Sequence, residues 1–363
     1  VSLYHRRISD MIIQQPLPVS AGASNMWVNV GEMTNKGLEF SLQGTPVETR
    51  DWHWSIRSNV AFNANEVTYL VEGVDFLRNG GNMGNHGGGV NVRSYVGRPM
   101  GDIYVNKVTR VTDPNSPYYG EKIVLVPGAG EDDGWGYYMT STGEAAQERV
   151  GNINPKFIGG LGTTLAYKRV SLDIMTDFRI GGYVMNNADF YPSCRGLTEK
   201  TLQYRDAEHG GLAYSFKGRT LNNGWIVPGV VQNGTEVDGN FVPDGTYRPN
   251  DVITSIDSYW YVTNNWGNSD SGTTYEFAIM ENSYWKVREL SLGYDLPKAL
   301  IRKAAFKNLT VSVFGRNLFY LYKTIPDIDP EATNGGTTWG GRAGVGYSSS
   351  PTRTFGVSLR ATF

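Results

Sequence analysis

The sequence predicts an all-β chain that crosses a membrane as part of a transmembrane antiparallel β-barrel. The last segment, residues 350–363, alternates apolar and polar side chains and ends on an aromatic residue. Seven further segments carry strand signals, and their connections alternate between short turns and very long loops, as in outer-membrane barrels. No stretch approaches the roughly 18 to 20 consecutive apolar residues that a spanning helix needs, so strands must supply the membrane character.

The final strand shows the alternation most clearly. One of its faces meets lipid in this interpretation, and the other meets a wet or plugged lumen. A terminal strand that ends on Phe is also the usual assembly signal of the outer membrane, so we assign this role to Phe363 and expect the Gram-negative outer membrane as the location. The apolar face carries Phe355, Val357, Leu359, Ala361 and Phe363, and the opposite face carries Thr354, Gly356, Ser358, Arg360 and Thr362.

Composition argues against several functional classes. The net charge is −2, so no basic surface points to nucleic acid. The single cysteine, Cys194, cannot form an internal disulfide, and the four histidines show no metal-ligand spacing. No nucleophile with its base, phosphate cradle or carboxylate pair stands out. We therefore expect no enzyme activity, no cofactor and no metal site.

The first three expected strands cover residues 1–13, 30–45 and 52–65. The first is followed by a loop through residue 29, and a short turn at 46–51 joins the second to the third. In both of these later strands, apolar residues alternate with polar ones. The apolar residues are Leu38, Phe40 and Leu42 in the second strand and Trp52, Trp54, Ile56, Val60 and Phe62 in the third.

The middle pair of strands covers residues 156–167 and 170–180, after a loop of roughly 90 residues. A tight turn at Lys168 and Arg169 joins the two strands, which predicts an antiparallel hairpin. Their apolar faces carry Phe157, Leu161, Leu165 and Tyr167 in the first strand and Val170, Leu172, Ile174, Phe178 and Ile180 in the second.

The last three strands cover residues 284–294, 309–320 and the terminal segment. A loop of about 100 residues precedes them, a connection with Pro297 joins the first two, and a Gly-rich loop at 327–349 leads to the end. All long connections then fall on one side of the membrane and all short ones on the other. A soluble β-sandwich would also alternate, but two structureless loops of this length within one compact domain count against it.

Eight strands could close a small barrel, yet we expect further strands to complete this one. The chain begins at Val1 inside an alternating strand, with no initiator Met and no signal peptide. Open sheet edges cannot face lipid, because their backbone groups would lack hydrogen-bond partners.

Six sequence blocks together resemble the SusC-type TonB-dependent transporters of Bacteroidetes outer membranes. They recur in family order across essentially the whole chain, and only their combination is specific. The blocks are Val28 to Glu39, Gly151 to Phe157, Ser283 to Tyr294 with Leu296 and Pro297, Val313 to Leu318, Asp327 to Glu331, and Pro351 to Phe363.

The resemblance implies active import of an oligomeric nutrient, with a glycan as the first candidate and an oligopeptide as the second. It implies a 22-stranded barrel of which residues 1–363 supply the last eight strands, with the plug domain and the TonB box outside this chain. It also implies as partners the TonB complex, a SusD-type surface lipoprotein that closes over the barrel, the plug and remaining strands, and membrane lipid with lipopolysaccharide. A passive porin-like channel and a surface glycan-binding module without transport stay open as alternatives.

Aromatic residues in the long loops are the candidates for substrate binding or contact with the lipoprotein lid. Indole and phenol rings suit sugar faces, but they equally anchor protein interfaces or pack their own loops, and all three alternatives remain open. An acidic cluster at Glu131, Asp132 and Asp133 is interpreted as a solvated surface, because it lacks the spacing of a calcium loop. The aromatic candidates are Trp135, Tyr137, Tyr138, Trp225, Tyr259, Trp260, Tyr261, Trp266 and Trp339.

Smaller features of the strands carry three further expectations. Gly159, Gly160 and Gly162 should make room for a neighbour such as a plug or for close approach between strands. Arg316 suits a polar lumen, although an ordinary ion pair between strands is the favoured interpretation. Tyr284 and Trp285 should belong to the outer girdle of aromatic residues.

Overall fold

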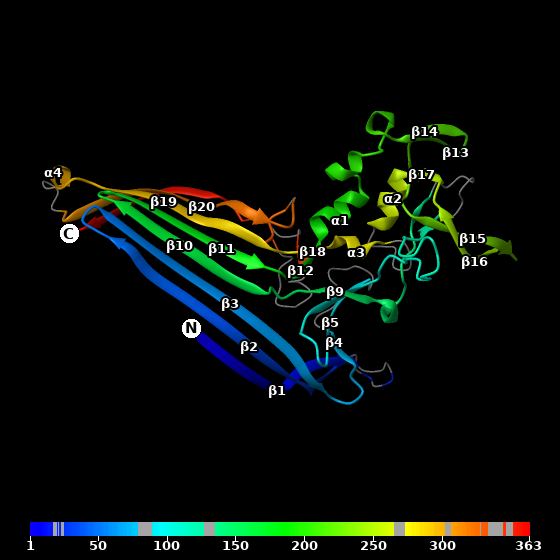
Figure 1. Ribbon diagram of the computed structural model, residues 1–363, viewed down its shortest axis with the longest axis horizontal. Coiled ribbons are helices and arrows are strands. Elements are labelled where there is room, and N and C mark those ends of the chain that lie inside the picture. The colour runs from blue at the N-terminus through cyan, green and yellow to red at the C-terminus, as the bar shows by residue number, and fades with distance from the viewer. Residues whose placement is uncertain are drawn as a thin grey trace.

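The structure is a computed structural model that describes residues 1–16, 20, 22, 25–78, 89–126, 135–264, 273–301, 306–326, 328–332, 344–345 and 351–363. Its main feature is an elongated, curved antiparallel sheet, and most of the remaining described chain gathers at one end of this sheet (Figure 1). In spatial order, the strands of this sheet are β1 (Ser2–Pro16), β2 (Asn25–Glu48), β3 (Trp52–Leu70), β10 (Phe157–Tyr167), β11 (Val170–Ile180), β19 (Tyr284–Asp295), β20 (Asn308–Lys323) and β22 (Thr354–Thr362).

These strands correspond to the eight that the sequence predicted. The hairpin of β10 and β11 turns at Lys168 and Arg169 as expected. β3 is longer than predicted, because it continues to Leu70. Val67 and Leu70 are buried there against Leu77 of the loop region instead of facing lipid. The pattern of alternating apolar and polar residues therefore does not extend to this end of the strand.

The register of the sheet confirms the predicted faces. Apolar side chains form continuous rows across the strands on one face, and polar side chains form rows on the other. One apolar row consists of Trp54, Leu165, Leu172, Leu292, Val313 and Val357. One polar-face row consists of Gln43, Arg57, Gly162, Met175, Glu289 and Arg316.

Aromatic residues border the apolar face at both ends. Trp52 and Tyr167 lie 4.4 Å apart between ring centroids near the short turns. At the other end, Phe178 and Trp285 lie 6.3 Å apart, in line with a ring pair at Phe62. Phe62 follows Trp52 by ten positions, which is about 33 Å of extended strand, and a tilt of about 40° reduces this to about 25 Å. That height matches the apolar band of an outer-membrane barrel.

The short connections and the C-terminus lie together at the end of the sheet opposite the long loops (Figure 1). The backbone N–H of Lys168 donates to the carbonyl of Asp51 at 2.6 Å, which ties two neighbouring turns together. α4 (Lys298–Ile301) lies in the connection between β19 and β20. The predicted assembly residue, Phe363, packs its ring 5.1 Å from that of Phe306 in the same connection.

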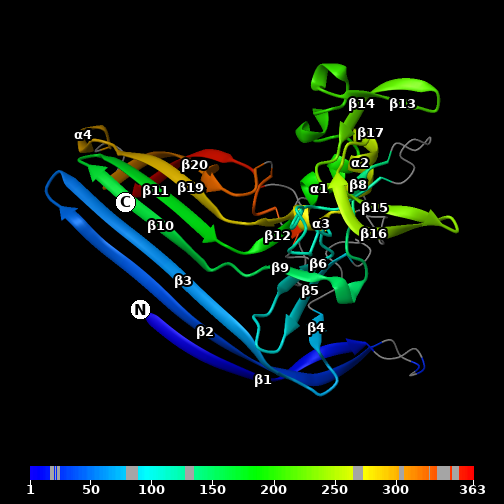
Figure 2. The ribbon, with the colours of Figure 1, turned by 45° about the vertical axis from the view of Figure 1, so that its right-hand side comes forward.

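The two longest loops are not structureless, which corrects the expectation from the sequence. Their described residues fold into one body, here called the loop unit, that contains small sheets and short helices (Figure 2). None of the helices in the described part of the chain is long and apolar enough to cross a membrane. The strands are β4 (Phe76–Arg78), β5 (Val90–Tyr95), β6 (Asp102–Val105), β7 (Val124–Leu125), β8 (Tyr137–Tyr138), β9 (Glu148–Asn152), β12 (Tyr183–Asn186), β13 (Leu212–Phe216), β14 (Arg219–Ile226), β15 (Val230–Val237), β16 (Asn240–Pro249), β17 (Ile253–Ser255) and β18 (Ile279–Glu281), with β21 (Gly344–Val345) paired to β12; the helices are α1 (Asn187–Cys194), α2 (Ile256–Thr263), α3 (Tyr275–Ala278) and the 3₁₀ turns η2 (Glu144–Ala146), η3 (Glu199–Leu202) and η4 (Ala207–His209).

The loop unit has apolar cores that neither loop could form alone. In one core, Val90 and Ile103 of the first loop pack with Phe190 and Tyr275 of the second. In another, Val124 and Tyr138 of the first loop pack with Tyr259 and other residues of the second. Burial of apolar surface between segments far apart in the sequence therefore holds the two loops together.

The joint between the sheet and the loop unit is tightly packed. β11 leads into β12 through Gly181 and Gly182, and both glycines have φ near +80°. A Cβ on Gly182 would lie 2.9 Å from the carbonyl oxygen of Ile153, so this close approach requires glycine. Arg179 donates a hydrogen bond to the same carbonyl at 2.9 Å, which fastens the end of the first loop to β11.

Placing an arginine on the apolar face should block assembly, whereas the same residue on the polar face should not. Leu290 lies on the apolar face about midway between the aromatic borders, and Ser291 is its polar-face neighbour. Leu290→Arg should cost about 2 to 4 kcal/mol at the midplane, while Ser291→Arg places its charge in the polar interior. Surface abundance and heat-modifiable gel mobility of the full-length protein measure the difference. Equal assembly of the two variants would contradict the assignment of the faces.

Candidate functional site

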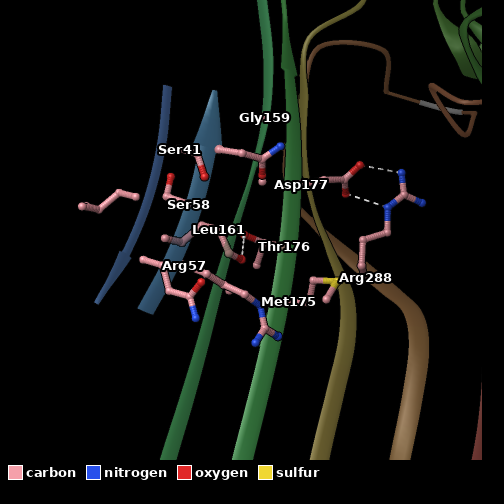
Figure 3. Close-up of a pocket in the computed structure, with 14 residues that line it drawn as sticks. Ser41, Arg57, Ser58, Gly159, Leu161, Met175, Thr176, Asp177 and Arg288 are labelled. Atoms are coloured by element: carbon pink, nitrogen blue, oxygen red, sulfur yellow. Dashed lines mark hydrogen bonds and ion pairs between the residues drawn. The ribbon is translucent and has the colours of Figure 1, made fainter. Parts of the chain in front are cut away.

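The polar face of the sheet has a depression of about 540 Å³ over β10. It lies where Gly160 and Gly162 present no side chain, between Arg57 on one side and Asp177 with Arg288 on the other (Figure 3). Gly160 pairs with Asn59 and Asp177, and Gly162 pairs with Arg57 and Met175. The depression therefore belongs to the interior surface of the predicted barrel wall.

The three glycines of β10 serve close approach on both faces. A Cβ on Gly162 would lie 2.6 Å from Nε of Arg57, and one on Gly160 would lie 3.1 Å from Oδ1 of Asn59. The side chains of Arg57 and Asn59 can therefore extend over β10. On the apolar face, a Cβ on Gly159 would lie 2.6 Å from the ring of Phe178. Close approach between strands is thus one role of these glycines.

Two of the sequence blocks meet beside the depression in a group of charged residues, here called the anchor cluster: Asp177, Lys286, Arg288, Asp329 and Glu331. Nζ of Lys286 lies 2.8 Å from Glu331 and 3.5 Å from Asp329, and only 2% of its side chain is exposed. Arg288 pairs with Asp177 at 2.7 Å (Figure 3) and also with Glu331. The cluster thereby fastens residues 328–332 to the upper ends of β11 and β19.

Neutral groups complete the hydrogen bonding of these carboxylates. Tyr320 donates to Asp329, and Tyr284 donates to Glu331 at 3.2 Å. Tyr284 therefore lies on the polar side, buried, which corrects its predicted place in the aromatic girdle, while Trp285 does lie there. Burial raises the pKa of Glu331, but hydrogen bonds and charges from Arg288 and Lys286 outweigh it and lower the pKa to about 2.

The favoured interpretation of Arg316 is confirmed. Its Nε lies 2.8 Å from Oε2 of Glu289 on the neighbouring strand, and both residues belong to the polar face. Its guanidinium also lies 4.9 Å from the ring centroid of Phe314. The pair is half exposed, so it orders side chains in the interior more than it stabilises the fold.

Three of the aromatic candidates surround a cavity of about 430 Å³ in the loop unit, here called the ring cavity. Trp135 and Tyr261 meet edge to face with ring centroids 6.3 Å apart, and Trp260 adds a third ring. Arg195, from the C-terminal end of α1, and Arg205, which follows η3, complete the polar part of the lining. The sequence indicated the rings as candidates but gave no signal for the two arginines. Only the fold of the second loop brings Arg195 and Arg205 close to the rings.

The other aromatic candidates lie elsewhere. Tyr138 and Tyr259, 3% and 7% exposed, belong to an apolar core, where burial raises the pKa of both phenols. Trp225 packs against Tyr259 at 4.6 Å, and Tyr137 pairs with Leu125 between β7 and β8. These four aromatic residues therefore pack within and between the loops. Trp266, Trp339 and the acidic cluster at Glu131, Asp132 and Asp133 lie outside the described residues.

Comparisons with known proteins give relatives of one kind. No protein-family model matches the chain. It is 24% identical over 380 residues to TonB-dependent receptor P3 of Formosa agariphila, covering 99% of this chain and 32% of that relative. It is 25% identical over 185 residues to TonB-dependent receptor SusC of Bacteroides thetaiotaomicron, covering 50% of this chain and 17% of SusC. The RagAB peptide importer in its open-open state matches with a TM-score of 0.59 and 19% identity over 99% of this chain and 32% of that structure.

The chain thus spans about a third of the length of the first of these relatives. The likenesses confirm the resemblance to SusC-type TonB-dependent transporters. They also confirm the predicted fold and location, since the eight-stranded sheet is part of a transmembrane antiparallel β-barrel of the outer membrane.

Glu331 should make the attachment of residues 328–332 sensitive to acid. Its pKa is about 2 in the folded protein and about 4.5 in the unfolded chain, so its stabilising contribution is complete above pH 4.5 and is lost as the pH falls toward 2. Hydrogen-exchange protection of residues 328–332, corrected for intrinsic rates, should fall across this range. Glu331→Gln should already lower protection at neutral pH, because it leaves buried cations with one partner fewer.

Glu289→Gln is the matched control for this prediction. It also removes one carboxylate, but Glu289 pairs with Arg316 and, within the described part of the chain, forms no hydrogen bond or ion pair with residues 328–332. Protection in this control should follow the wild type. If Glu331→Gln also behaves like the wild type, the anchor cluster does not hold the segment.

Proposed function

We propose that this chain forms part of the wall and the outer vestibule of an outer-membrane importer for an oligomeric nutrient. The proposed importer is energised by TonB and works with a SusD-type surface lipoprotein. The main support is one arrangement: a sheet with an apolar band about 25 Å high carries an ordered loop unit at one end only. A wall of this kind separates lipid from a polar path, and the loop unit stands at the entrance to that path.

A glycan is our first candidate for the cargo, and an oligopeptide is the second. The ring cavity favours a glycan, because flat indole and phenol rings suit the faces of sugar rings. The peptide alternative is supported by the solved neighbour, which is described as a peptide importer. A passive porin-like channel is the alternative from another class, and a dependence on TonB separates it from active import.

Uptake by cells that produce the full-length protein tests this proposal. Labelled oligosaccharides and oligopeptides of matched size should accumulate only when TonB is present, and the oligosaccharides should accumulate more. Uptake that continues without TonB, together with ohmic conductance of the purified barrel, would instead support the passive channel. Cells without the protein provide the background.

The hairpin of β15 and β16 is the part of the loop unit that we propose as a contact for the lipoprotein. It projects from the loop unit away from the sheet (Figures 1 and 2). Its outer end exposes apolar side chains, with Phe241 54% and Val242 47% exposed. Apolar side chains on a protruding element are costly in water and favour a protein partner. The wider proposed contact surface comprises the loops at residues 67–152 and 184–282.

Removing this apolar tip should weaken capture of the lipoprotein without affecting the barrel. Phe241→Ser combined with Val242→Ser should reduce binding by about tenfold, since buried aromatic anchors dominate protein interfaces. Leu300→Ser is a suitable control, because Leu300 is also highly exposed but belongs to α4, at the end of the sheet opposite the loop unit (Figure 1). Affinity capture at equal surface level gives the readout. Unchanged capture by the double variant would place the contact elsewhere.

A further inference from the structure

We propose that the ring cavity binds an oligosaccharide that carries carboxylate groups, such as a chain of uronic acids. This inference rests on the proposed function, since it names the class of cargo that the loop unit would meet. The cavity has a volume of about 430 Å³, which is within the range of small-ligand sites. Its lining combines flat rings, cations and hydroxyl-binding groups, and each of these has a separate role.

The rings provide surfaces on which a sugar can stack. Trp135, Trp260 and Tyr261 all line the cavity, and Trp135 and Tyr261 meet edge to face. Tyr261 is 41% exposed, so part of this apolar ring remains available from outside. Asp257 and Ser258, at the start of α2, place a carboxylate and a hydroxyl group beside the rings. Such groups can exchange hydrogen bonds with sugar hydroxyl groups.

The two arginines give the cavity a preference for anions. Nη2 of Arg195 donates to the hydroxyl of Tyr191 at 3.1 Å, and Nη2 of Arg205 donates to the carbonyl of Gly196 at 2.8 Å. Both acceptors are neutral, and neither arginine forms a salt bridge within the part of the chain that the structure describes. These bonds orient the guanidinium groups and leave their positive charge uncompensated. Further N–H groups on each arginine remain for a ligand carboxylate, which the planar guanidinium can bind in bidentate fashion.

Two charged groups near the arginines, in the part of the chain that the structure describes, already have partners of their own. The next cation along the chain, Lys200, is already paired with Asp189 at 2.6 Å. The one carboxylate among the described lining residues, that of Asp257, accepts a hydrogen bond from Asn223 at 2.7 Å. Among the described lining residues, two guanidinium groups without a salt bridge accompany one carboxylate, so this part of the lining carries a net positive charge. An anionic ligand would balance it.

The lining elements favour a saccharide over a peptide. Extended peptides are commonly held by main-chain hydrogen bonds to a free strand edge, and helical ones by an apolar groove. The described lining comes from the end of α1, from η3 and the turn after it, and from α2, with Trp135 as the only residue beside a strand. It offers no strand edge along which a peptide could pair. Stacking on rings and charge recognition do not need one.

Binding to the purified full-length protein in detergent tests the inference. The probes are a tetramer of galacturonic acid, a tetramer of mannuronic acid, and the methyl ester of the first, which keeps the sugar rings but removes the charge. Calorimetry should give at least one acid that binds about tenfold more tightly than the ester, a difference of about 1.4 kcal/mol. Arg195→Gln combined with Arg205→Gln should remove this advantage and leave binding of the ester unchanged.

Matched variants separate the effect of charge from an effect on folding. Arg219→Gln removes an exposed arginine from β14 in the same loop unit and should bind all probes like the wild type. Arg195→Lys with Arg205→Lys keeps both charges and should retain part of the preference for the acid. Heat-modifiable mobility shows whether each variant is assembled.

Several outcomes would overturn the inference. These are equal binding of acid and ester, absence of binding by both acids, an unchanged double variant, and arginine-dependent binding of a tetramer of glutamic acid in place of the saccharides. The assay needs no TonB and no lipoprotein. If the acid binds as expected but cells show no TonB-dependent uptake, the proposed import function fails while the binding site stands.

Discussion

The hydrogen-bonding needs of a backbone in lipid constrain this structure more than any single contact. Hydrocarbon offers no partner for an N–H or C=O group, so each strand must pair with its neighbours along its whole membrane-crossing length. Pairing then fixes the register, and the register sends alternate side chains to lipid and to the interior. Irregular backbone and the small helices are consequently confined to the ends of the sheet, where the loop unit and the turns lie (Figure 1).

A cluster of ion pairs lies where this regular wall meets the irregular loop unit. Removing Lys286 from water is costly, and the cost is offset because two carboxylates of another segment lie within 4 Å of its ammonium group. The segment at residues 328–332 needs those cations equally, since its carboxylates are also partly buried. The mutual dependence gives the final loop a defined starting point on the sheet.

Period-two alternation is a strong signal, and for that reason the sequence located all eight strands and the hairpin turn at Lys168. Features that depend on contacts between distant segments were beyond it. The sequence around Tyr259 is the same whether its ring packs in a core or faces a ligand. The ring is buried only because the two long loops meet around it. Tyr284 was misplaced because it directly precedes Trp285 in β19, and consecutive residues of a strand point to opposite faces. Arg195 and Arg205 carried no pattern at all.

The crowded joint at Gly182 has a mechanical consequence. Ile153, Arg179 and Gly182 are in close contact, so the connection from β9 to β10 and the connection from β11 to β12 are packed against each other. We therefore expect a force applied to the loop unit to reach β10 and β11 through these contacts. The depression lies over the same strands, so we expect a displacement of the loop unit outside the membrane to change the shape of this interior surface.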